Sequence, residues 1–96
     1  MTRDEILAEA EKNVCGQRTH DYGEPEDNFA VIARFWNVYL EALDYSELTP
    51  RDVANMMALL KIARNTTGKG TMDCWIDLAG YAACGGEIAS REAGHE

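Results

Sequence analysis

Hydrophobic residues recur along this chain at intervals of three and four positions, which is the periodicity of helices that bury one face. The first such segment spans about residues 3–14. Thr2 and Glu5 have the spacing of a capping box at its start, and Gly16 offers a left-handed stop after it. Its apolar side consists of Ile6, Leu7, Ala10 and Val14.

A second segment, about residues 26–43, is apolar on two sides. One face carries Phe29, Ile32, Ala33, Trp36, Tyr39, Leu40 and Leu43, and the other carries Val31, Phe35, Val38 and Ala42. Short partner helices from a single chain do not easily cover both faces. We therefore expect a homo-oligomer, in which a second copy completes the core.

A third helix is signalled by Thr49 as the N-cap, with Pro50 at the first helical position, and it runs to about residue 65. A loop rich in turn-forming residues follows over positions 65–71. Thr71 can cap a last helix that runs to about residue 91.

Small residues are unusually frequent in that last helix, which contains Gly80, Gly85 and Gly86. Glycine is unfavourable in a helix interior, so their presence suggests that another backbone approaches closely. The whole pattern predicts a single all-α domain over residues 1–96. We expect a four-helix bundle, or two long hairpins paired with a second subunit.

Composition narrows the function classes. The 96 residues carry a net charge of −8, most of it in the first 27 positions, which makes broad nucleic-acid binding unlikely. No apolar run approaches the roughly 20 residues that span a bilayer, so we expect no membrane association. An odd number of cysteines without a secretion signal indicates reduced thiols in a cytoplasm, with Cys74 and Cys84 buried on the last helix.

Charged residues on the apolar faces of the last two helices are the main candidates for chemistry. Arg64 projects within about 20° of Val53 in the core-facing arc, which also holds Met56, Met57 and Leu60, and Lys61 flanks it. A charge at such a position must be paired or must face a polar pocket. On the last helix Asp73 and Asp77 lie one turn apart on one side.

Two interpretations of these charges remain open. In the first, Asp73 and Asp77 share a hard cation such as Mg²⁺, which activates water, while Lys61 and Arg64 neutralise phosphate charge. In the second, Asp73 only complements the helix dipole and Asp77 pairs with Arg64 as a structural ion pair.

The stretch between the first two helices, residues 18–28, is the other candidate. Tyr22 could stack on a base while Asn28 binds its edge, or the segment could be only a turn. In the turn interpretation Gly23 takes a positive φ, Pro25 begins the next helix, and Asp27 or Asn28 caps it. Trp36 and Trp75 are most simply core residues.

Several of these residues together resemble a known group of proteins. The pattern consists of Arg18-x3-Tyr22-Gly23, Asn28-Phe29, Asp52-Val53-Ala54, Met56-Met57, Lys61-x2-Arg64, Asp73-x-Trp75-x-Asp77-x2-Gly80-Tyr81 and Glu87. It is similar to short phage and prophage proteins of unassigned function. These in turn resemble the all-α nucleoside triphosphate pyrophosphohydrolases, the MazG-like group. That resemblance implies an oligomeric helical bundle whose acidic residues hold Mg²⁺ and cleave a nucleotide between its α- and β-phosphates.

The chain departs from the MazG-like signature, which places one acidic cluster, E-E-x-x-E, on one helix and E-x-x-D on the next. Here the third helix offers only Asp52, followed by Lys61 and Arg64. Three hypotheses follow. The leading one is a Mg²⁺-dependent pyrophosphohydrolase with Asp73 and Asp77 as catalytic metal ligands. In it, Lys61 and Arg64 bind phosphate, and a segment with Arg18, Tyr22 and Asn28 binds the nucleotide.

The second hypothesis keeps the nucleotide pocket without the hydrolysis. The protein would then be an oligomeric binder, for example one that sequesters a signalling nucleotide of host defence. The third is an acidic inhibitor that binds a protein by mimicking DNA.

Overall fold

Five helices form the part of the chain that the computed structural model describes, which is the backbone of residues 1–94 and their side chains except at 17–19. They are α1 (Arg3–Cys15), α2 (Gln17–Tyr22), α3 (Pro25–Ala42), α4 (Pro50–Arg64) and α5 (Met72–Glu92). The all-α prediction is confirmed. The predicted count of four is one too low, because residues 17–22, expected in a loop, form the short helix α2.

Local signals set most of the helix ends. The capping boxes predicted at both Thr2 and Thr49 are present, each with its hydroxyl accepting from the backbone of the third helical residue. Two expectations are wrong. Gly16 has φ −122° instead of a left-handed conformation, because the chain continues directly into α2. Thr71 occupies the N-cap position of α5 but its side chain makes no capping hydrogen bond.

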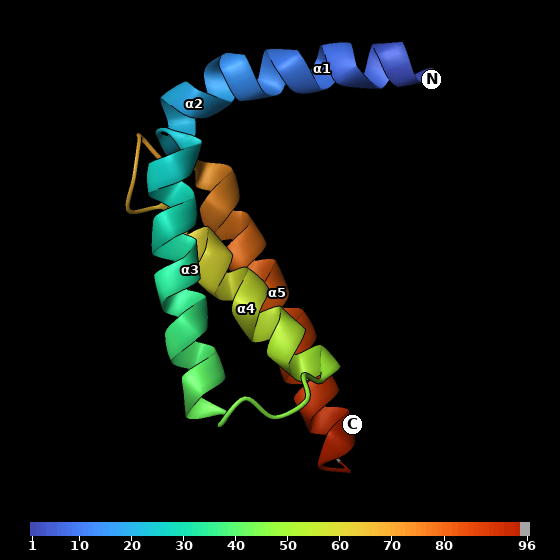
Figure 1. Ribbon diagram of the computed structural model, residues 1–96. Coiled ribbons are helices and arrows are strands. Elements are labelled where there is room, and N and C mark those ends of the chain that lie inside the picture. The colour runs from blue at the N-terminus through green and yellow to red at the C-terminus, as the bar shows by residue number, and fades with distance from the viewer. Residues whose placement is uncertain (95–96) are drawn as a thin grey trace.

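α4 is the central helix of the molecule. It packs along α5 on one side and along α3 on the other, whereas α1 packs against α2 and extends away from the rest (Figure 1). The helices therefore form an open arrangement over residues 1–94 rather than a closed four-helix bundle. The radius of gyration, 16.0 Å, exceeds the value of about 12.5 Å expected for a compact chain of this length.

Few side chains are fully buried in this arrangement. Among the side chains that are described, the buried hydrophobic ones are Ile32, Ala54, Ala63 and Cys74. Trp36 is half-buried and donates its indole N–H to the Met56 carbonyl at 2.8 Å. Three residues expected in the core, Val53, Trp75 and Cys84, are exposed instead, because none of the helices described within residues 1–94 covers their faces.

None of the helices within residues 1–94 is both long and apolar enough to cross a membrane.

Candidate functional site

The candidate site begins where two turns lie against each other, the turn between α2 and α3 and the loop between α4 and α5 (Figure 1). Gly70 donates its backbone N–H to the Asp21 carbonyl at 2.6 Å, and the Thr67 hydroxyl donates to the Tyr22 carbonyl at 2.5 Å. Gly23 and Gly68 both have positive φ, 82° and 61°. A Cβ on Gly68 would lie 2.3 Å from the Gly23 nitrogen, so only glycine permits this approach.

Asn28 joins these turns to α3 and α4. Its side-chain amide donates to the Thr67 hydroxyl at 2.7 Å and to the Ala63 carbonyl at 3.5 Å, and the residue is buried. The predicted cap at Asp27 or Asn28 is wrong, since α3 begins at Pro25 after an N-cap at Glu24. Asn28 therefore fixes the site's framework, with its amide hydrogens directed at the protein.

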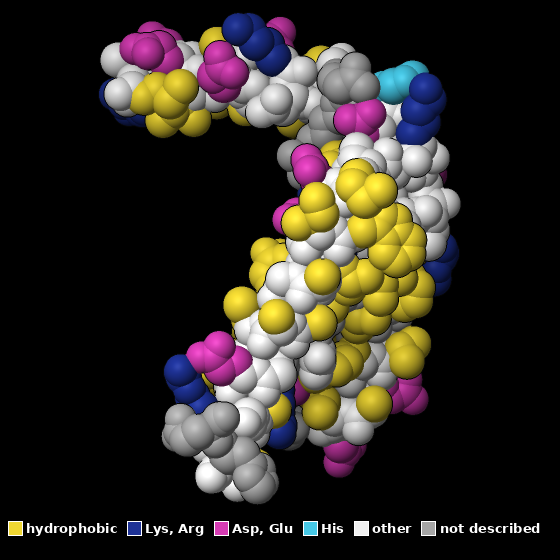
Figure 2. All heavy atoms as spheres, turned by 180° about the vertical axis from the view of Figure 1, so that it is seen from behind, with side chains coloured by type: hydrophobic (Ala, Val, Ile, Leu, Met, Phe, Trp, Pro, Cys, Tyr) yellow, Lys and Arg dark blue, Asp and Glu magenta, His cyan; other side chains and the backbone are white. Residues whose placement is uncertain are grey.

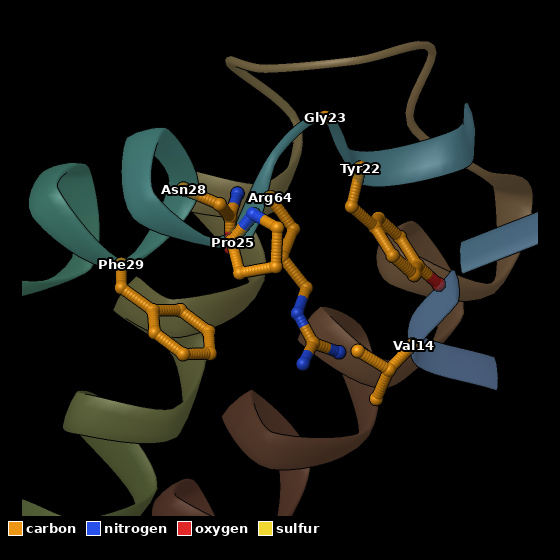
Figure 3. Close-up of a pocket in the computed structure, with 7 residues that line it drawn as sticks. All are labelled: Val14, Tyr22, Gly23, Pro25, Asn28, Phe29 and Arg64. Carbon is orange, nitrogen blue, oxygen red and sulfur yellow. The ribbon is translucent and has the colours of Figure 1, made fainter. Parts of the chain in front are cut away.

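A cavity of about 220 Å³ opens beside this framework, between the end of α1, the α2–α3 turn and the end of α4. Val14, Tyr22, Gly23, Pro25, Asn28, Phe29 and Arg64 line it (Figure 3). Its walls are mostly apolar, with Arg64 supplying a positive charge. Such a combination of apolar surface and a few polar groups is typical of small-molecule sites.

Arg64 is the distinctive residue of this cavity. Its guanidinium carbon lies 5.0 Å from the centre of the Tyr22 ring, within the range of a cation–π contact. Figure 3 shows the guanidinium directed into the space between Phe29 and Val14. The residue is half-buried, and no carboxylate among the described side chains forms an ion pair with it. With respect to the described side chains, the guanidinium can therefore offer its donors to an anion.

Asp77 pairs with Lys61, not with Arg64 as one interpretation expected. The Lys61 Nζ and Asp77 Oδ2 lie 3.0 Å apart, with side chains 12% and 47% exposed. The pair links α4 to α5, and the ammonium group neutralises the carboxylate that the metal interpretation requires. Arg64 lines the cavity and Lys61 does not, so the structure does not bring these two basic residues to one site.

Of the remaining predicted residues, Asp73 lies apart from the cavity. Asp73 is exposed in the first turn of α5, and the side chain of Arg18 lies outside the described residues. No group of three or more His, Cys, Asp or Glu side chains able to hold a metal occurs within the part of the chain that was searched. With Asp77 already paired to an ammonium, Asp73 and Asp77 do not fit a magnesium site as they stand.

A second polar cluster joins the other end of α3 to the start of α4. The Tyr39 hydroxyl donates to Asp52 Oδ1 at 2.6 Å and accepts from Asn55 at 2.9 Å, while Thr49 donates to Asp52 Oδ2. These donors lower the pKa of the Asp52 carboxyl, Tyr39 most of all. Burial, followed by the bond to Asp52, raises the pKa of Tyr39. The cluster is a helix cap that also orients α3.

Sequence reasoning missed several residues of the cavity and of the two turns beside it. Val14, Pro25 and Phe29 were assigned to helix faces or helix starts, and Thr67 and Gly68 only to a loop. The run Thr-Thr-Gly-Lys-Gly was the available signal, because closely spaced glycines in a loop often mark an approach of two backbones. No periodicity could have shown which turn the loop approaches.

Comparison with known proteins agrees with part of the earlier resemblance. Residues 5–89 match the family described as Domain of unknown function (DUF6378). The chain belongs to this family. It is 44% identical over 77 residues to the Gene 55 protein of Mycobacterium phage L5, covering 80% of the chain and 47% of that protein. It is 45% identical over 82 residues to the Gene 55 protein of Mycobacterium phage D29, covering 82% and 50%.

The chain thus spans about half the length of the curated relatives it matches. The predicted resemblance to phage proteins is confirmed by these matches. The further resemblance to MazG-like enzymes stays a prediction. No solved structure matches the chain.

Proposed function

We propose that this protein of the DUF6378 family binds a nucleotide, or a closely related aromatic phosphate, in the Arg64 cavity and leaves it intact. The observation that carries the proposal is the half-buried Arg64 guanidinium, which lies over Tyr22 and has no carboxylate partner in the described structure. Arginine is well suited to phosphate because its planar donors form paired, charge-assisted hydrogen bonds.

The shape of the cavity supports a ligand with both a ring and an anion. Tyr22, Pro25 and Phe29 supply flat apolar surface, and Phe29 remains 62% exposed as one wall. The volume of about 220 Å³ is below the roughly 300–1,000 Å³ of sites that enclose a whole drug-sized ligand. The cavity therefore accommodates one part of a nucleotide and leaves the remainder outside.

The positions and partners of Asp73 and Asp77 favour binding of the nucleotide over its hydrolysis. Asp77 is occupied by Lys61, and Asp73 stands outside the cavity. A binder that does not turn over its ligand would sequester it, including a signalling nucleotide of host defence. We further propose that the protein acts in the cytoplasm of a bacterial host. We also propose that it is a homo-oligomer, because many large apolar side chains remain exposed in the single chain.

The binding test is isothermal calorimetry with nucleoside mono-, di- and triphosphates and with cyclic nucleotides. At least one should bind the wild-type protein, and Arg64→Met should weaken it about 10- to 100-fold, the value of a hydrogen bond to a charged group. Arg34→Met on the exposed side of α3 is the matched control and should bind as the wild type does. Uptake of no nucleotide by the wild type refutes the proposal.

A second experiment separates binding from hydrolysis. The protein is incubated with nucleoside triphosphates and Mg²⁺, and the ligand is then recovered by heat denaturation. The proposal predicts intact triphosphate. Release of pyrophosphate that disappears in Asp77→Asn would instead favour the pyrophosphohydrolase prediction.

A further inference from the structure

The side of α5 that points away from α4 is apolar and uncovered. On the α4 side, Cys74 is buried, and a Cβ on Gly85 would lie 3.0 Å from the Ala54 side chain. On the opposite side, Met72 and Ile76 are 71% and 61% exposed, and a Cβ on Gly86 would meet nothing within 4 Å. In the view from behind, α5 shows isolated hydrophobic side chains beside a larger apolar area toward α3 (Figure 2).

The uncovered residues have the spacing of a helix-pairing seam. They alternate by four and three positions through Met72, Ile76, Ala79, Ala83 and Gly86. Apolar residues at this spacing keep one face directed at a partner helix along several turns. None of the five is charged, although the protein as a whole carries −8.

The order of sizes along this seam determines the direction of the partner. Its large residues, Met72 and Ile76, come first and its small residues, ending in Gly86, come last. A parallel copy would place Ile76 against Ile76 and Gly86 against Gly86, which gives a clash at one end and a gap at the other. An antiparallel copy places the large Ile76 opposite the small Gly86, and it places two small residues, Ala79 and Ala83, opposite each other nearer the axis.

We propose that a second copy of this chain docks on the α5 seam, with the two α5 helices antiparallel about a two-fold axis near residue 81. A surface that is complementary to itself in one direction is the requirement for a two-fold interface. The small residues allow the helix axes to approach to about 8 Å, the close end of the usual range.

The chain as a whole exposes more surface than a compact monomer of its mass, as a protein that pairs with a second copy would. The accessible surface of the chain is 6917 Å², compared with about 5,500 Å² expected for a folded protein of its mass. The excess is larger than the roughly 800 Å² that each partner buries in a standard interface. α1, which projects from the molecule (Figure 1), contributes to this excess, as do exposed side chains of α5 such as Met72 and Ile76.

This inference rests on the homo-oligomer of the proposed function and is independent of the Arg64 cavity. The first test is the mass in solution, measured by light scattering during gel filtration. The wild type should have at least twice the chain mass of 10.7 kDa. Ala83→Arg should reduce it to the mass of one chain, and Ala30→Arg, an exposed alanine on the polar side of α3, should leave it unchanged.

The possible outcomes separate the claims. A monomeric wild type would overturn both the oligomer and the seam. An oligomeric wild type that Ala83→Arg leaves intact would overturn the seam alone. Nucleotide binding by the Ala30→Arg variant is measured in parallel. That measurement tests the Arg64 cavity and does not depend on the α5 seam. Circular dichroism confirms that each variant retains its helices.

Cysteine cross-linking tests the direction of the helices without destabilising them. In a background with Cys15→Ser and Cys84→Ser, Ala79→Cys and Ala83→Cys chains carrying tags of different size are co-expressed and oxidised with copper phenanthroline. A disulfide requires Cα atoms about 4.4–6.8 Å apart. The antiparallel seam predicts a covalent heterodimer of the two variants. Homodimers of either single variant, or no cross-link at all, would overturn it.

Discussion

Mutation of the Lys61–Asp77 ion pair tests whether this pair stabilises the contact between α4 and α5. The perturbation is Asp77→Asn, which retains the shape of the side chain but removes its charge. Lys61 is 12% exposed and Asp77 47% exposed, with 3.0 Å between the Lys61 Nζ and Asp77 Oδ2 atoms. Removing the carboxylate therefore leaves a largely buried ammonium without its partner.

The magnitude follows from the uneven burial of the two groups. Breaking a fully buried pair costs about 3–5 kcal/mol, whereas exposed pairs contribute about 0–1 kcal/mol. Because one partner is buried and the other half-exposed, we expect Asp77→Asn to lower the free energy of unfolding by about 2 kcal/mol. The double variant Lys61→Met/Asp77→Ala should recover much of this loss, since no charge is then left unpaired.

Urea denaturation at a fixed protein concentration, in the presence of a chelator, measures these values. Glu87→Gln is the control, because Glu87 forms an exposed pair with Arg91 on the same helix and should contribute only about 0.5 kcal/mol. Equal stability of Asp77→Asn and the wild type would refute the structural role of the pair. A loss of stability seen only with Mg²⁺ present would identify Asp77 as a metal ligand instead.

Four further predictions concern the framework and the assembly. Tyr39→Phe should lower the free energy of unfolding by about 1 kcal/mol, because the variant lacks the hydroxyl that joins α3 to the α4 cap. The pKa of Asp52 in the folded protein is lowered from 3.8, so the ionised carboxylate should stabilise the protein above about pH 4 and stop doing so as the pH falls further. In Asp52→Asn, the free energy of unfolding should therefore fall less steeply with decreasing pH in this acidic range. Gly68→Ala should destabilise the protein by at least about 2 kcal/mol, since φ is 61° and the new Cβ would lie 2.3 Å from the Gly23 nitrogen. Gly80→Ala should instead stabilise its helix by up to about 1 kcal/mol, because a Cβ there has no atom within 4 Å. Because each copy carries −8, the dimer dissociation constant measured by sedimentation should fall as salt is raised from 20 to about 300 mM, and a constant that rises with salt would contradict an uncharged seam.

The helices could be predicted because their signals are local. Thr2 and Thr49 with their partners three residues later specify two starts, and Pro25 and Pro50 fall at first helical positions. The short helix α2 was missed, since six residues without an apolar stripe have no readable periodicity. The exposure of Trp75 was also missed. The spacing of hydrophobic residues shows that a helix face is apolar, but not whether another helix of the chain packs against it.

The candidate site could be predicted only residue by residue. Arg64 was recognised as a charge in an apolar arc, and Tyr22 as an aromatic in a polar turn. Their contact depends on the α4–α5 loop folding back against residues 21–23, a long-range approach that requires Gly68. The interpretation that gives Asp77 an ion-pair partner names Arg64, whereas the structure pairs it with Lys61. Lys61 and Arg64 lie one turn apart on α4, and helical projection alone does not decide which of them reaches α5.

The central claim is that the Arg64 cavity binds a nucleotide, and nuclear magnetic resonance tests it most directly. The side-chain Nε–H signal of Arg64 is followed while the nucleotide selected by calorimetry is added to the protein without metal. The account predicts a saturable shift of that signal, accompanied by the Tyr22 and Phe29 ring signals, and none at Asp73 or Asp77. A nucleotide that leaves the Arg64 signal unchanged, or that shifts Asp73 and Asp77 only when Mg²⁺ is present, would contradict it.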